Sequence, residues 1–192
     1  MAIPLDVKLD LQQQVPRQMR RDLQRVATEN FKKVKREMIE EFLANPITQE
    51  ILAGPEGSNI SGTLGSVGNL FAFIGFERGE QPISPILTLL EGVTLEYRKP
   101  TKNLGMGIIF EVTLPTAEDI FAVTPLPWAS GRSWAEGIER GLSGLGYLLR
   151  KNKGRSGAAI QSRVKVRGGR FHNTPYISAF IRKYKKRFED LQ

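Results

Sequence analysis

Residues 15–46, "VPRQMRRDLQRVATENFKKVKREMIEEFLANP", determine how the chain is built. Apolar residues recur along it every three to five positions, which is the spacing of one face of an α-helix. The pattern predicts a helix of about 28 residues and about 40 Å, with Pro16 in its first turn and Asn45-Pro46 at its end. Its apolar residues are Val15, Met19, Leu23, Val26, Phe31, Val34, Met38 and Phe42.

A helix of this length exceeds one face of a compact domain of 192 residues. Two interpretations stay open. Part of the helix packs against another chain, or the helix lies across a sheet of its own chain. A second, short helix is predicted directly after it, with Asn45 as N-cap, Pro46 at its first position and Gly54 as the stop.

Residues 54–69, "GPEGSNISGTLGSVGN", are rich in glycine and predict a loop or an extended arm. Their G-x-x-G-x-x-G spacing is followed by no Gly-Lys-Ser/Thr and follows no clear strand, so it does not support a phosphate-binding loop. Leu70–Phe76 predicts a buried strand. Residues 84–92 predict a helix capped by Ser84 and stopped by Gly92.

Two strands, a helix start and a loop are predicted next. Residues 93–98 alternate apolar and polar, and residues 106–115 return as their partner in an antiparallel hairpin. Thr116 and Asp119 have capping spacing before a short helix. A proline-bounded loop then presents Trp128.

Ser133 and Glu136 form a predicted capping box. They open a helix whose apolar stripe runs from Trp134 to Leu149. Its glycines, Gly137, Gly141 and Gly144, indicate either the close approach of another backbone or a helix that is short or frayed.

The chain ends in a strongly basic region. Residues 151–159 predict a basic loop and residues 160–169 a strand with one charged face. The last helix is predicted to be capped by Thr174 and opened by Pro175. Its apolar stripe consists of Ile177, Phe180, Ile181, Tyr184, Phe188 and Leu191.

Charge is divided unevenly along the sequence. The net charge is +3 over residues 1–40, −6 over residues 41–145 and +11 over residues 146–192. Such a basic end predicts an anionic partner, either nucleic acid or an acidic protein face, or else a solvated tail. The candidate residues for that contact are Arg163, Lys165, Arg167, Arg170, Arg182, Lys183, Lys185, Lys186 and Arg187.

Few residues point to catalysis. The chain has no cysteine and one histidine, His172, so a zinc site is not expected. No G-x-S-x-G nucleophile elbow is present. The carboxylate pairs Glu40-Glu41 and Glu118-Asp119 fit helix positions that need no enzymatic explanation. We therefore expect a protein that is not an enzyme and that binds no cofactor and no metal.

Together these patterns predict one α+β fold: a small antiparallel sheet packed with helices, a long N-terminal amphipathic helix and a basic C-terminal helix. The expected segments are an N-terminal helical part (1–53), a glycine-rich loop or arm (54–69) and an α+β body (70–192). No run of 18 apolar residues occurs and the start does not read as a signal peptide, so no membrane association is expected.

The order of these elements, with the strings "GNLFAFIGFERGEQPI" and "FHNTPYISAFIRKYKKRF", resembles the neck and tail-completion (head–tail connector) proteins of tailed bacteriophages. The resemblance implies a virion structural protein, made in the host cytoplasm, that forms a homo-oligomeric ring at the neck or tail end. Its implied partners are copies of itself, neighbouring neck or tail proteins and DNA in the lumen. Two alternatives stay open: a nucleic-acid-binding protein that uses the basic C-terminal region, and an assembly scaffold that uses the long helix as a coiled coil.

Overall fold

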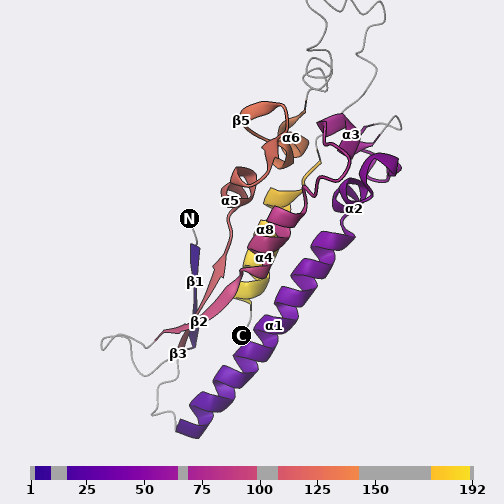
Figure 1. Cartoon of the computed structure of the whole chain (residues 1–192). Coiled ribbons are helices and arrows are strands. Elements are labelled where there is room, and N and C mark those ends of the chain that lie inside the picture. Colours follow the sequence, from indigo (N-terminus) through magenta and orange to yellow (C-terminus); the bar gives the residue numbers. More distant parts are fainter. Residues whose placement is uncertain (1–2, 10–16, 65–68, 99–107, 143–173, 191–192) are drawn as a thin grey trace, which may run out of the picture.

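A computed structural model describes residues 3–9, 17–64, 69–98, 108–142 and 174–190 (Figure 1). For residues 3–9, 17–20 and 108 it describes the backbone alone. The helices and strands, in chain order, are β1 (Ile3–Leu9), α1 (Arg17–Ala44), α2 (Pro46–Leu52), the 3-10 helix η1 (Gly54–Glu56), α3 (Leu70–Ile74), α4 (Ser84–Glu91), β2 (Thr94–Arg98), β3 (Ile108–Leu114), α5 (Ala117–Ala122), β4 (Pro125–Leu126), β5 (Ala129–Ser133), α6 (Trp134–Arg140) and α8 (Ile177–Glu189).

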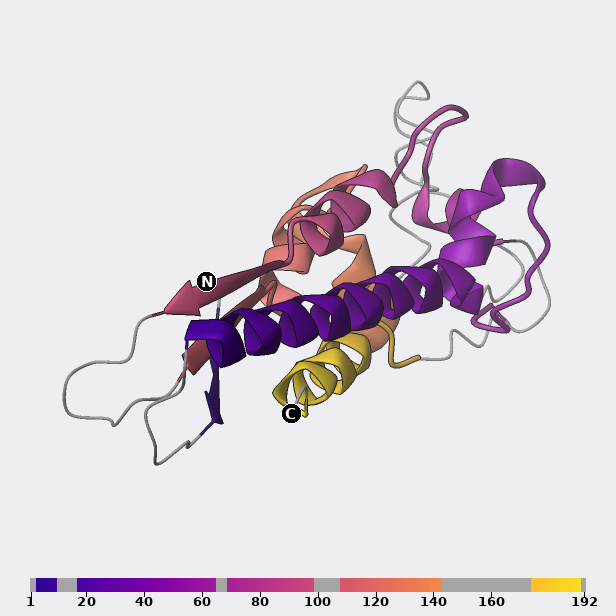
Figure 2. The ribbon, with the colours of Figure 1, turned by 90° about the horizontal axis from the view of Figure 1, so that it is seen from below.

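Helix α1 is the longest element and the predicted long helix is confirmed. It spans 28 residues and runs along the described structure, with α8 on one side and α4 on another (Figures 1 and 2). It ends at Ala44, and Oδ1 of the next residue, Asn45, accepts a hydrogen bond from the backbone N of Ile47 at 2.9 Å. That contact caps α2, as the sequence predicts.

The larger sheet is antiparallel and has the strand order β1-β3-β2. The predicted hairpin is confirmed as β2 and β3, with Tyr97 opposite Phe110. Strand β1, which the sequence analysis did not predict, pairs with the other edge of β3 and places Val7 opposite Phe110. A second, two-stranded sheet joins β4 to β5. The α+β fold with a small antiparallel sheet is therefore confirmed.

One hydrophobic cluster joins the helices to the sheet. It combines residues from Phe31 on α1 to Phe188 on α8 and includes Val112 and Leu114 of β3. Burying side chains of this size supplies most of the folding free energy of a domain. The largest fully buried members are Trp134, Tyr176, Tyr184, Phe42 and Phe188. Near the N-terminal half of α1, Phe110 forms a smaller contact with Leu23 and Ala27.

The predicted strand at Leu70–Phe76 is wrong, because residues 70–74 form helix α3. Asn69 Oδ1 accepts a hydrogen bond from Ala72 N at 2.8 Å and caps the helix. Gly75 ends it with φ of 94°, a left-handed conformation that glycine adopts without strain. A short apolar run between such caps cannot be distinguished from a buried strand by periodicity.

The described part of the glycine-rich segment is a loop held against α2. The buried carboxylate of Glu50 accepts hydrogen bonds from Ser61 N at 3.0 Å and from Leu70 N at 2.7 Å. The Asn69 amide donates to the carbonyl oxygens of Gly54, Pro55 and Gly57. These contacts fix both ends of the loop, so its described residues do not extend away from the body as an arm.

Three smaller predictions also need correction. Ser84 is the first residue of α4, after Ile83 at the N-cap, and makes no capping hydrogen bond. Trp128 is half-buried, and its indole N–H donates to Ile74 O at 2.6 Å, so the loop does not present it. At Gly137 a side chain approaches instead of another backbone: a Cβ there would lie 2.2 Å from Leu142 Cδ1.

Other local predictions hold in full or in part. Thr116 and Asp119 form the reciprocal capping box of α5. Of the capping box predicted at α6, the structure has one bond, in which Ser133 Oγ accepts from Glu136 N at 3.1 Å. Helix α6 ends at Gly141, whose φ is 110°. The predicted helix is therefore wrong beyond Arg140, because Gly141 and Leu142 are not helical, and the alternative of a short helix holds. Residues 143–149, the basic loop at 151–159 and the strand at 160–169 lie outside the described residues.

Candidate interaction surface

Helices α1 and α8 form an antiparallel pair that carries most of the described basic residues. The rings of Phe31 and Phe188 have centroids 5.7 Å apart, as do those of Phe42 and Phe180. Later residues of α1 therefore meet earlier residues of α8. The pair is seen along its length in Figure 2, and its outer side is a surface rather than a cavity.

Helix α8 begins differently from its prediction, because Thr174 and Pro175 lie before the helix and Tyr176 is the N-cap residue. The Glu139 carboxylate on α6 takes the capping role instead. Its Oε1 accepts from Ser178 N at 2.6 Å and from Tyr176 N at 3.2 Å, and its Oε2 accepts from Ser178 Oγ at 2.6 Å. A carboxylate at a helix N-terminus also interacts favourably with the helix dipole. Helix α6 thereby fixes the position of α8.

Two of the five candidate cations on α8 are bound to α1. Lys183 Nζ lies 2.6 Å from Glu41 Oε2 and 2.7 Å from Oε1, and Arg187 pairs with Glu37. The Tyr184 hydroxyl donates to Glu41 Oε2 at 2.7 Å. These two cations hold α1 and α8 together, which leaves them less available to a partner.

These contacts change the ionisation of the groups involved. Burial tends to raise the pKa of Glu41, but the hydrogen bonds from Lys183 and Tyr184 hold it below its ordinary value of 4.5. Burial of the hydroxyl, followed by its hydrogen bond to Glu41, raises the pKa of Tyr184. The hydrogen bond to Glu37 raises the pKa of Arg187. The lowered pKa of Glu41 keeps its carboxylate charged to a lower pH.

The other three candidate cations on α8 have no ion-pair partner among the described residues. Arg182 and Lys186 are exposed and Lys185 is half-buried. Arg182 and Lys185 border a groove of about 390 Å³ between α8 and the turn that joins β3 to α5. Leu114 and Ile181, both buried, also line it, and Glu118 lies at its edge. We call this the α8–α5 groove.

A second basic row, which the sequence analysis did not single out, lies on the solvent side of α1. It consists of Arg21, Arg25, Lys32, Lys33 and Arg36, and all five are exposed. Arg25 contacts Asp22 at 3.4 Å and Lys32 contacts Glu29 at 3.9 Å, both weak surface pairs. The signal was in the sequence, because these positions repeat at helical spacing opposite the apolar stripe.

The acidic middle of the chain projects a turn at residues 77–80. Glu80 N donates to Glu77 O at 3.1 Å, and Glu77 N donates to Glu80 Oε2 at 2.9 Å. Arg78 forms an exposed ion pair with Glu56 of η1. Gly79, at the tip, has φ of 95° and no atom within 4 Å of where a Cβ would lie. We call residues 77–80 the acidic turn.

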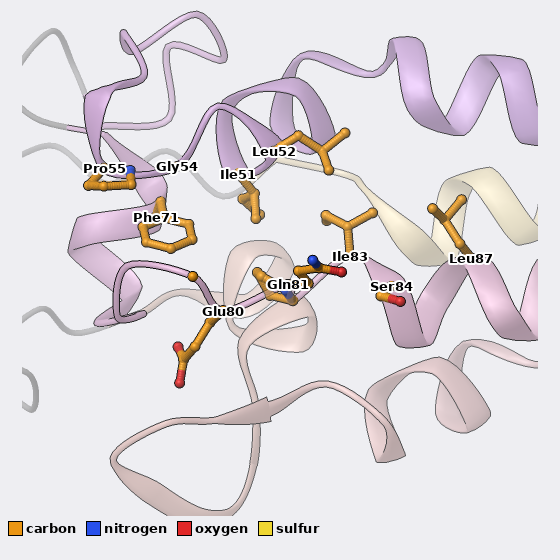
Figure 3. A pocket seen from close by; sticks show the side chains of 12 residues that line it. Ile51, Leu52, Gly54, Pro55, Phe71, Glu80, Gln81, Ile83, Ser84 and Leu87 are labelled. Carbon is orange, nitrogen blue, oxygen red and sulfur yellow. The ribbon is translucent and has the colours of Figure 1, made fainter.

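Beside the acidic turn lies a groove of about 340 Å³ between α2, η1 and the start of α4 (Figure 3). Ile51, Phe71 and Ile83 are buried side chains of its lining. Leu52, at its edge, is 51% exposed. Glu80 and Gln81 border this groove, so the acidic turn lies at the end of the molecule that contains α2, η1 and α3 (Figure 1).

The remaining sequence-predicted residues cannot be placed. Arg163, Lys165, Arg167 and Arg170 lie outside the described residues, as does His172. Within the described ranges, no three His, Asp or Glu side chains are grouped so that they could hold a metal ion. Among the same residues, no helix has the length and apolar character needed to cross a membrane.

Comparison with known proteins gives no relative. No protein-family model, no curated protein and no solved structure matches the chain.

Proposed function

We propose that the chain is a structural subunit of a tailed-phage virion and that it forms a homo-oligomeric ring at the neck or tail end. The observation that carries the proposal is the separation of charge over the described structure. A preorganised acidic turn projects at one end, and cations without ion-pair partners among the described residues border a groove beside α8. The resemblance to neck and tail-completion proteins agrees with it.

Two different, oppositely charged surfaces on one subunit favour head-to-tail contacts between copies. Contacts of this kind close into a ring when the rotation per subunit permits, and otherwise give a filament. The α1–α8 pair, tied by Lys183, Arg187 and Tyr184, supplies a stiff frame. The proposal assigns no catalytic step to any residue.

The test has two arms. Light scattering with mass determination on the purified chain is expected to give one discrete mass several times that of the 21.5 kDa subunit, and electron microscopy is expected to show closed rings. Mass spectrometry of purified tailed virions that encode the chain is expected to find it at a fixed number of copies. A chain that stays monomeric and is absent from those virions contradicts the proposal.

A second candidate function, nucleic-acid binding, is favoured by the basic row on α1. Arg25 and Arg36 of that row lie on the same helix pair as Arg182 and Lys186 of α8. Exposed cations along two neighbouring helices suit a phosphate backbone. Affinity for duplex DNA is then expected to fall with salt, with a log–log slope of roughly −0.9 for each phosphate contacted.

The matched variants for this second function are Arg36→Gln and Arg132→Gln. Both arginines are exposed, and Arg132 lies on β5, away from the helix pair (Figure 1). Arg36→Gln is expected to reduce the magnitude of the salt slope by about 1, whereas Arg132→Gln leaves it unchanged. Equal slopes for the wild type and both variants contradict a role for the α1 row.

A further inference from the structure

We infer that the acidic turn of one copy docks into the α8–α5 groove of the next copy. The inference rests on the proposed ring and names its contact. It follows from the chemistry of the groove, the chemistry of the turn and the place of each in the fold.

The α8–α5 groove has an apolar floor with charged edges. Leu114 and Ile181 are buried within it, and Ala117 is half-buried on its wall. Arg182 and Lys185 supply two positive charges, and Glu118 supplies one negative charge. A groove of this kind suits a short segment that carries carboxylates and has little side-chain bulk at its tip.

The acidic turn has the inverse pattern. Glu77 and Glu80 supply two carboxylates around the single guanidinium of Arg78, and Gly79 at the tip has no side chain. Two cations and one carboxylate in the groove thus face two carboxylates and one cation in the turn. Complementarity of this kind selects the partner and fixes how it is oriented.

The turn is also held in one conformation before it meets a partner. The hydrogen bonds between Glu77 and Glu80 define its shape, and the exposed Arg78–Glu56 pair adds a weak surface contact. Fixing a loop in its bound form removes part of the ordering entropy that binding otherwise costs. It therefore has the features of a docking element, and at its tip no atom lies within 4 Å of where a Cβ of Gly79 would be.

The turn does not fill the groove of its own chain. In the same copy, Gly79, Glu80 and Gln81 border the other groove, between α2 and α4, and none of them lines the α8–α5 groove. Because every copy carries both the turn and the groove, each copy can donate to one neighbour and accept from another. That is the heterologous contact that a ring requires.

The absence of cysteine from the sequence allows a direct test. Gln81→Cys places a thiol beside the turn, and Ala117→Cys places one in the groove, while every charge is kept. The two purified variants are mixed under mild oxidation, and mixed disulfides are measured by non-reducing electrophoresis and mass spectrometry. Disulfides form only where the Cα atoms come within about 7 Å, so we expect a high yield of the mixed dimer.

The matched control pairs Gln81→Cys with Ser130→Cys, an exposed position on β5. We expect the groove pair to give at least about tenfold more mixed disulfide than this control, which is the ratio produced by about 1.4 kcal/mol of specific association. Equal yields from the two pairs overturn the inference.

Charge reversal identifies the interaction that drives docking. Arg182→Glu with Lys185→Glu in the groove partner is expected to reduce the yield to the control level. Glu77→Lys with Glu80→Lys in the turn partner is expected to do the same, and combining the two reversed partners is expected to restore it. No recovery in the reversed combination contradicts the charge complementarity.

The outcomes separate the contact from the ring. Closed rings of wild-type chain together with control-level cross-linking overturn the contact and leave the proposed function intact. A specific disulfide without rings supports the contact and counts against the ring. Control-level cross-linking together with loss of DNA binding on reversal of Arg182 and Lys185 assigns the groove to nucleic acid and overturns the inference.

Discussion

The two halves of α1 belong to one uninterrupted helix but have different surroundings. In residues 31–44, Met38 is fully buried and Phe42 contacts Phe180 and Tyr176. In residues 21–30, Val26 is 52% exposed and the apolar contact is limited to Leu23 and Ala27 against Phe110. The C-terminal half is part of the core, whereas the N-terminal half lies against one end of the sheet.

The polar contacts of the two halves differ in the same way. Glu37, Glu41 and Lys35 in the C-terminal half bind residues far away in the sequence. Asp22 and Glu29 pair with residues one turn away on α1 itself. An amphipathic pattern that runs through a helix therefore does not say that the whole helix is buried in its own chain. The following four experiments test this difference, from the largest expected effect to the smallest.

The largest effect is expected from Phe42→Ala. The side chain is 1% exposed and its removal leaves a cavity among aromatic rings, so the free energy of unfolding should fall by about 3–5 kcal/mol. Val26→Ala, in the other half, should change it by less than about 0.5 kcal/mol. Urea unfolding of both variants measures the difference, and similar losses would show that the two halves are equally buried in solution.

A smaller loss is expected from Tyr184→Phe. The hydroxyl donates to the Glu41 carboxylate at 2.7 Å and lies 3.1 Å from Glu37 O, so its removal should lower the free energy of unfolding by about 1.5 kcal/mol. Tyr97→Phe is the control, because Tyr97 is partly exposed on β2. Thermal unfolding of the two variants compares them. A Tyr184→Phe protein as stable as the control contradicts the contact between α8 and the C-terminal half of α1.

Lys35→Met should have an effect of about 1 kcal/mol. Lys35 Nζ donates to Glu91 O at 2.6 Å and to Val93 O at 2.9 Å, at the C-terminal end of α4. Lys32→Met removes only the surface pair with Glu29 and is expected to change the unfolding free energy by less than 0.5 kcal/mol or so. Hydrogen exchange of the last turn of α4 gives a local readout. Exchange there should accelerate in Lys35→Met alone.

The smallest effect is a pH dependence. Because the pKa of Glu41 is lowered in the folded protein, its contribution to stability is present above its ordinary value of 4.5 and is lost as pH falls through the lower folded value. Glu41→Gln should therefore flatten the acid side of the stability curve. Glu40→Gln, on the exposed side of the same turn, should leave the curve as in the wild type. Curves of equal slope for all three proteins would contradict an acid-sensitive link at Glu41.

The sequence predicted the long elements well, because their patterns repeat often enough to be read. Helix α1 shows its apolar stripe over eight turns or so, and α8 shows its own through Ile177, Phe180, Ile181, Tyr184 and Phe188, all buried. The α2 and α5 caps were predicted because Asn45, Thr116 and Asp119 bond to residues two or three positions away.

The errors have two physical causes. Helix α3 is too short for the spacing of its apolar residues to distinguish a helix from a strand. Only its capping residues, Asn69 and Gly75, indicate a helix. The start of α8 depends on Glu139, some 37 residues earlier than Tyr176, and no local rule predicts such a cap. The failure to predict strand β1 has neither cause. Ile3, Leu5, Val7 and Leu9 alternate with other residues at strand spacing, so the sequence does contain the pattern of a strand there.

The candidate interaction surface was predicted in part. The five basic residues of α8 were identified from composition, but the sequence did not show that Lys183 and Arg187 are bound to α1. Nor did it show that Arg182 and Lys185 border a groove with Leu114. The cations that bind α1 and the cations that border the groove can be distinguished only when the face of α8 that contacts α1 is known. That face is set by contacts between residues more than 140 positions apart in the sequence.

The capping of α8 by α6 has a consequence for anyone who alters this protein. Glu139 accepts hydrogen bonds from Tyr176 and Ser178, and Thr174 N donates to Ile138 O at 3.3 Å. The start of α8 therefore lies directly against the end of α6. The N-cap residue of α8 lies 37 residues after the carboxylate that holds it. A substitution at Glu139 should therefore be felt in a helix that is distant from it in the sequence.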